Sequence, residues 1–142
     1  MCSEPYLQSE YGGDYGTQSP VKLLDRLYYG FPESEEEELV VLSQVLACDA
    51  TLGYEDIYNV QLLRFNGEEV KNLKSLASMV LACKDKYCRF DLEYNELVII
   101  ETDKLRKATM DVMENHAVPH AMSADLRKQF GPWPLKFHSF KA

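Results

Sequence analysis

Residues 60–80, VQLLRFNGEEVKNLKSLASMV, predict a strand, a tight turn and a helix in direct succession. The first part is rich in branched and aromatic side chains, which strands favour. Asn66-Gly67 then gives the strongest short signal for a two-residue turn, and Asn72 can cap a helix. The apolar residues of that helix share one face at the helical period: Leu73, Leu76, Ala77, Val80 and Leu81.

Two further apolar strands are expected to cover this helix face, at residues 39–46 and 97–100. Residues 39–46, LVVLSQVL, begin with a nearly continuous apolar run, typical of a strand covered on both faces. Residues 87–92 alternate apolar and polar side chains, and Tyr94-Asn95 turns the chain into the apolar strand 96–101. We therefore expect an α+β fold, a small and mostly antiparallel sheet or partial barrel packed with two to three helices.

The flanks of this core divide the chain into three parts. Residues 1–18 mix tyrosines with glycines, which suggests an extended or looping N-terminal arm whose tyrosines dock on a neighbour. Residues 19–126 form the domain, with residues 39–101 as its core and helices on either side. Residues 127–142 are expected to be a flexible tail.

Two flanking helices are predicted from their ends. Ser19 would cap the first, with Pro20 in its first position, and Gly30 would end it. Thr102 or Asp103 would cap the last helix. The inner face of the first helix is expected to carry four residues: Val21, Leu24, Leu27 and Tyr28.

Composition excludes several classes of function. The 142 residues include 15 basic and 23 acidic side chains, a net charge of −8, so the phosphates of a nucleic acid would be repelled. No apolar run is long enough to span a membrane.

The acidic run at residues 33–38 is interpreted as a solvated loop, with partner binding as the alternative. Three cysteines lie in apolar surroundings and are expected to be buried free thiols: Cys48, Cys83 and Cys88.

No catalytic, metal or cofactor site is predicted. A serine nucleophile needs a strained, glycine-flanked turn, and no glycine lies beside or two residues before a serine. The cysteines and histidines lack zinc-ligand spacing, and no glycine-rich loop suited to phosphate precedes a helix. The three histidines, all in the last quarter of the chain, are interpreted as surface or helix-end residues: His116, His120 and His138.

Several segments resemble the second, C-terminal PDZ domain of plant Do-like (Deg) serine proteases, of the HtrA/Do class. The similarity covers roughly residues 4–127, follows the family order and is closest to the chloroplast members. The matching segments are PYL (5–7), SPVKLLD (19–25), LVVLSQVL (39–46), GYEDI (53–57), FNGEEVKNLKSL (65–76), RFDLEY (89–94) and AVPHAMSADL (117–126).

The resemblance implies a module for protein interaction and oligomerisation. In a PDZ fold, a peptide strand is added between a sheet edge and a helix. Carried over to this chain, the strand would contribute Leu39 and Val41, and the helix would contribute Leu73, Leu76 and Val80. The implied partners are Deg subunits or peptide segments, together with self-association, and the implied compartment is the chloroplast.

The chain also departs from the family pattern. The catalytic residues of the family precede this region, so none is expected here. The family's first strand and glycine-rich loop precede the position of residues 5–7, whereas this sequence begins with residues 1–4, MCSE, and shows no transit peptide. A PDZ-like fold lacking its first family strand is therefore expected. The alternatives are a fragment of a serine endopeptidase that needs the absent protease domain, or a non-functional truncated product.

Overall fold

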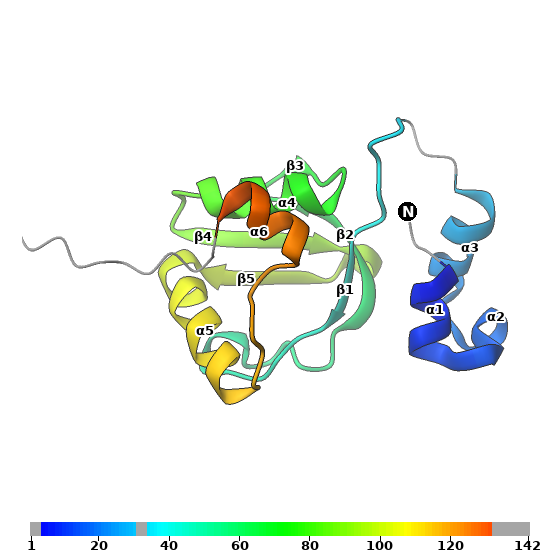
Figure 1. Ribbon diagram of the computed structural model, residues 1–142, viewed down its shortest axis with the longest axis horizontal. Coiled ribbons are helices and arrows are strands. Elements are labelled where there is room, and N and C mark those ends of the chain that lie inside the picture. The colour runs from blue at the N-terminus through cyan, green and yellow to red at the C-terminus, as the bar shows by residue number, and fades with distance from the viewer. Residues whose placement is uncertain (1–3, 31–33, 132–142) are drawn as a thin grey trace, which may run out of the picture.

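The computed structural model describes residues 4–30 and 34–131, without the side chain of Leu27. Its centre is a curled antiparallel sheet in the order β1-β2-β4-β5, with the short β3 paired to β2 (Figure 1). The strands are β1 Val41–Gln44, β2 Tyr58–Phe65, β3 Glu68–Glu69, β4 Tyr87–Leu92 and β5 Leu97–Glu101. The predicted α+β fold with a mostly antiparallel partial barrel is confirmed.

Three helices follow or flank this sheet. They are α4 Leu73–Ala82, α5 Thr102–Asn115 and α6 Ala124–Phe130. Helix α6 lies beside α4, and α5 continues directly from β5 (Figure 1). Three more helices, grouped near β1, precede the sheet: α1 Glu4–Tyr11, α2 Tyr15–Gln18 and α3 Val21–Tyr29. Single 3-10 turns η1 Gly12–Asp14, η2 Asp49–Thr51 and η3 Glu93–Asn95 complete the path.

The strand-turn-helix unit forms as its local signals predict. Asn66 and Gly67 have φ angles of 47° and 85°, the left-handed conformation that a two-residue hairpin turn requires. At the start of α4, the Ser75 N–H donates to Asn72 Oδ1 at 2.7 Å, and the Asn72 N–H donates to Ser75 Oγ at 3.2 Å. This reciprocal cap satisfies backbone donors at the helix N-terminus.

The main core lies between the sheet and α4. Its buried residues include Phe65, whose ring centroid is 5.2 Å from that of Phe90. The helix contributes Leu76, Val80 and also Met79, which the predicted face omitted. Leu73, predicted on that face, is 46% exposed. It is the first residue of α4.

A second, smaller core holds the N-terminal helices together. Leu7 of α1 is 0% exposed and Leu23 of α3 is 1% exposed, and Leu39 and Val41 pack against them. Residues 4–18 are thus helical, and the extended or looping arm predicted for residues 1–18 is wrong over this part. The tyrosines of α1 do contact β2, because Asn59 Oδ1 accepts from the Tyr6 hydroxyl at 2.8 Å.

The predicted details of α3 are partly wrong. Gly30 does end the helix, but Pro20 is its cap residue and Ser19 Oγ is buried without a hydrogen-bond partner among the described residues. Val21 is 71% exposed and Tyr28 is also exposed, whereas Leu23 faces the core. Leu27, also predicted inward, has a side chain outside the described residues. The buried face of α3 is determined by α1, because Leu7 of α1 packs with Leu23 in the second core.

Two boundaries near the C-terminus also differ from the prediction. Glu101 is the cap residue of α5 and makes no side-chain cap bond, so neither Thr102 nor Asp103 caps the helix. Thr102 is instead buried, and its hydroxyl donates to the Asp85 carbonyl at 2.6 Å. The predicted flexible tail, residues 127–142, begins inside α6, which runs to Phe130; residues 132–142 lie outside the described residues.

Tyr54 covers part of the outer edge of β5. Its hydroxyl oxygen lies 3.3 Å from both the backbone N and the backbone O of Ile99. One side chain therefore satisfies a donor and an acceptor that an edge strand would otherwise offer to another chain.

Replacing Tyr54 with phenylalanine keeps the ring and removes both hydrogen bonds. We expect the free energy of unfolding to fall by about 0.5–1.5 kcal/mol, as measured by urea denaturation. Tyr58→Phe, at an exposed tyrosine of β2, is the matched control and should change stability by less than about 0.5 kcal/mol. Equal effects of the two variants would show that the Tyr54 hydroxyl does not support the β5 edge.

Candidate functional site

The outer edge of β1 is a row of backbone groups that point away from its neighbour. The Leu62 N–H donates to the Val40 carbonyl at 2.9 Å, and the register pairs Leu42 with Val60. Bonded and non-bonded pairs alternate along an antiparallel ladder. Val41 and Ser43 therefore direct their N–H and C=O groups away from β2. Within the described ranges, 4–30 and 34–131, β2 is the strand to which β1 pairs.

A groove of about 490 Å³ lies beside the start of β1. It brings together three of the five predicted site residues, Leu39, Val41 and Leu73. The other two, Leu76 and Val80, do not line the groove but pack against the main core. The groove thus has an apolar floor from one strand and the first residue of one helix.

Carboxylates form the rim of this groove. Glu35, Glu37 and Glu38 line it next to Leu39. The rim is fixed in place by backbone contacts, since the Glu38 N–H donates to the Lys71 carbonyl at 2.7 Å. The sequence predicts a solvated loop for this acidic run. One feature of the sequence does indicate its place at the groove. The run directly precedes an apolar strand, so its charges lie beside the start of that strand.

The Asn72 side chain connects the rim to α4. Asn72 Nδ2 donates to the Glu36 carbonyl at 2.9 Å, while Asn72 Oδ1 caps the helix. The same side chain therefore sets both the start of α4 and the path of the acidic rim. This contact explains why Leu73 and the rim glutamates border one groove.

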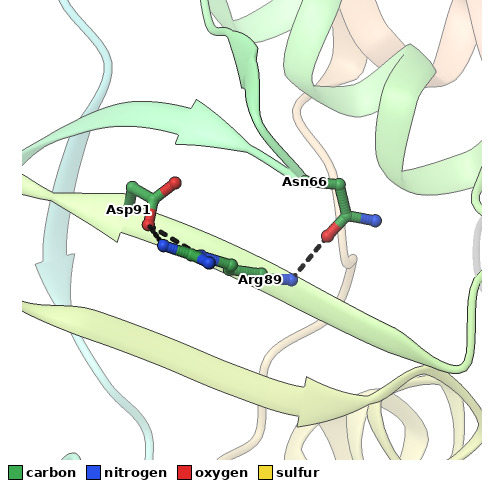
Figure 2. A network of polar contacts seen from close by, with 3 residues as sticks. All are labelled: Asn66, Arg89 and Asp91. Atoms are coloured by element: carbon green, nitrogen blue, oxygen red, sulfur yellow. Dashed lines mark hydrogen bonds and ion pairs between the residues drawn. The ribbon is translucent and has the colours of Figure 1, made fainter.

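A second hollow, of about 680 Å³, lies on the outer face of the sheet. Figure 2 shows the polar contacts at Arg89, which lines it: the Arg89 N–H donates to Asn66 Oδ1 at 2.7 Å, and the guanidinium lies 2.9 Å from Asp91 Oδ1. The first of these contacts ties the Asn66-Gly67 turn to β4, and the second lies within β4. Arginines and carboxylates are mixed along this hollow, so it presents no field of a single sign.

Within residues 4–30 and 34–131, no group of three or more histidine, cysteine or acidic side chains is placed to hold a metal ion. In the same part of the chain, no helix has both the length and the apolar content needed to cross a membrane.

The sequence is similar to several plant proteases over a limited part of their length. Protease Do-like 2, chloroplastic, from Arabidopsis thaliana is 35% identical over 128 residues, which is 90% of this chain and 20% of that protein. From the same plant, Protease Do-like 4, mitochondrial, is 35% identical over 98 residues (69% of this chain, 18% of that protein), and Putative protease Do-like 12, mitochondrial, is 31% identical over 102 residues (72% and 20%). This chain spans about a fifth of the length of these relatives.

A family model described as PDZ domain matches residues 1–125. The match agrees with the curled antiparallel sheet and with the strand edge beside a helix. It also confirms the resemblance seen in the sequence segments. The chain belongs to the PDZ domain family.

Proposed function

We propose that this PDZ domain binds an extended segment of another protein along the outer edge of β1. The observation that carries the proposal is the outward backbone of Val41 and Ser43 beside an apolar groove. Adding a strand to a sheet edge gives affinity through backbone hydrogen bonds, and pockets for alternate side chains give selectivity. The apolar contacts would come from three groove residues: Leu39, Val41 and Leu73.

In this proposal, Leu76 and Val80 do not contact the bound segment but hold α4 in position. Both pack against the main core and fix the position of α4. Their contribution to binding is therefore to hold the helix, and through it Leu73, at the groove. Substituting either one should lower stability as well as binding.

Ser43→Pro is the direct test of strand addition. Proline removes the outward N–H of Ser43, and proline is tolerated on the free side of an edge strand. Ser43→Ala is the matched control, because it keeps the N–H. The probe is a panel of fluorescent peptides with alternating apolar and basic residues, measured by anisotropy. We expect Ser43→Pro to weaken the tightest-binding peptide at least about tenfold, or roughly 1.4 kcal/mol. Equal affinities for the two variants, with both folded by circular dichroism, would refute the proposal.

The acidic rim indicates a partner with basic side chains. Opposite charges accelerate the encounter of two surfaces, and salt screens the effect. We expect Glu35→Lys/Glu38→Lys to slow association with a basic peptide about tenfold at low salt and to remove most of its salt dependence. Asp111→Lys/Glu114→Lys, on exposed positions of α5, changes the net charge equally and is the control. If both variants slow association equally, net charge rather than the rim attracts the peptide.

The partners proposed are subunits of Do-like proteases, peptide segments, or a second copy of this chain. Homology to PDZ parts of proteases supports the first two, and the free β1 edge supports self-association and a role in oligomer assembly. Sedimentation velocity over a concentration series distinguishes them. Self-association that Ser43→Pro abolishes would be assigned to this edge. A monomer at all concentrations would exclude self-association and leave protease subunits and peptide segments as the proposed partners.

We further propose that the chain has no proteolytic activity of its own. The matched part of each relative is about a fifth of its length, and no nucleophile motif occurs in this sequence. The alternatives are a piece of a serine endopeptidase that acts with a protease domain, and a product without function. Casein cleavage that a serine-directed inhibitor abolishes would overturn the proposal.

The division of the chain into residues 1–18, 19–126 and 127–142 is also a proposal. Limited proteolysis tests it. Cleavage near residue 18 that releases a stable fragment from residue 19 onward would support the first boundary. Resistance there would join α1 and α2 to the domain, as the contacts of Leu7 with Leu23 favour.

A further inference from the structure

Two buried cysteines lie next to each other at the end of α4. Cys83 is the residue after the helix and Cys88 is in β4, and their Sγ atoms are 3.9 Å apart. Both are free thiols, with Cys83 7% and Cys88 1% exposed. Their separation along the sequence is only five residues, so the intervening turn holds them together whenever β4 and α4 are in place.

Polar groups surround this pair and make its two sulfurs different. Asn66 Nδ2 lies 3.5 Å from Cys83 Sγ and can donate to it, whereas Cys88 Sγ lies 3.4 Å from the Thr102 hydroxyl. Arg106 also reaches the site, because its Nη2 donates to the Cys83 carbonyl at 2.9 Å. Burial raises the pKa of the Cys88 thiol and so disfavours its thiolate form. Cys83 is the less buried of the two and faces the amide of Asn66.

We propose that Cys83 and Cys88 form an oxidation site, where hydrogen peroxide produces a disulfide that ties the end of α4 to β4. In the first step, the Cys83 thiolate attacks one peroxide oxygen, breaks the O–O bond and becomes a sulfenic acid, while hydroxide leaves. In the second step, the Cys88 sulfur attacks the sulfenic sulfur and water leaves. Two thiols and one peroxide thus give one disulfide and two waters.

The geometry requires a small movement. A disulfide has an S–S length of about 2.0 Å, so the sulfurs approach each other by roughly 2 Å in total. Side-chain rotation and the short turn between the two residues supply this movement. Because Leu76 and Val80 lie on α4 and Leu73 borders the groove, oxidation fixes the helix beside the proposed binding edge. The disulfide itself does not depend on that binding function.

Tryptic mapping of the full chain tests the proposal. Trypsin cleaves after Lys74, Lys84, Lys86 and Arg89, which places Cys83 in peptide 75–84 and Cys88 in peptide 87–89. The folded protein is treated with a small excess of hydrogen peroxide, remaining thiols are alkylated, and the digest is analysed by mass spectrometry. We expect the linked peptides 75–84 and 87–89 as the main oxidation product, lost after treatment with dithiothreitol.

Three comparisons keep the test decisive. Cys48→Ala should give the same yield of the linked peptides, and oxidation in urea should instead give mixed linkages, since the pair is aligned by the fold. In Cys88→Ala, Cys83 should proceed to sulfinic acid. The proposal is overturned if Cys83 and Cys88 stay open to alkylation while another cysteine is oxidised. It is also overturned if the folded and urea-treated proteins give the same linkages.

Discussion

Replacing Phe65 with alanine is expected to lower the free energy of unfolding by about 3–5 kcal/mol, the usual cost of truncating a buried aromatic residue. Phe65 is the last residue of β2, is 3% exposed and packs its ring against Phe90. The turn at Asn66-Gly67 follows immediately, so the cavity would open beside this turn, in the core against which α4 packs. Urea denaturation followed by circular dichroism measures the change.

Leu63→Ala is the control for this experiment. Leu63 is in the same strand but is 36% exposed and lines the hollow on the outer face of the sheet. Its truncation should cost less than about 1 kcal/mol. If the two substitutions cost the same, the core would not lie on the Phe65 side of β2, and the packing of α4 described above would be wrong.

Replacing Leu23 with alanine is expected to cost about 2–5 kcal/mol. Leu23 is almost fully buried, with Leu7 on one side and Leu39 and Val41 nearby. Its loss should therefore loosen the N-terminal helices and β1 together. We expect a single unfolding transition at a lower urea midpoint, because the second core joins α1 and α3 to the strand.

Val21→Ala in the same helix is the matched control. Val21 is 71% exposed, so its truncation should change stability by less than about 0.5 kcal/mol. The contrary result for Leu23→Ala would be two separate transitions, with only the first shifted. That outcome would make the N-terminal helices an independent unit.

The elements predicted correctly from the sequence are those whose signals are local. Asn66-Gly67 determines its turn through two positive φ angles, and Asn72 caps its helix through its own side chain. Alternation along residues 87–92 likewise matches the burial of Cys88 and Leu92. Each of these features depends on neighbours within a few residues, which a sequence displays directly.

The predictions that were wrong concern residues whose burial depends on segments distant in the sequence. The sequence predicts the helix α3 but not its buried face. That face contains Leu23 because α1 covers it, and the sequence predicts an extended or looping arm in place of α1. Leu73 fits the apolar period of α4 and is nevertheless 46% exposed at the first position of the helix.

Tertiary contacts also explain what the sequence did not show at the site. The acidic rim lies beside the groove because the Asn72 side chain and the Lys71 carbonyl hold residues 36–38 there. Likewise, the spacing of Cys83 and Cys88 fits no metal motif, and only the folded path from the end of α4 into β4 shows that the two sulfurs are neighbours.

Amide hydrogen exchange at β1 tests the central claim most directly. The exchange of four backbone amides is followed by NMR, with and without the tightest-binding basic peptide: Val41, Leu42, Ser43 and Gln44. In the free chain, Leu42 and Gln44 should be protected by β2 and Val41 and Ser43 should exchange rapidly. Binding should slow exchange at Val41 and Ser43 by at least about tenfold. A bound peptide that leaves both rates unchanged would contradict strand addition at the β1 edge.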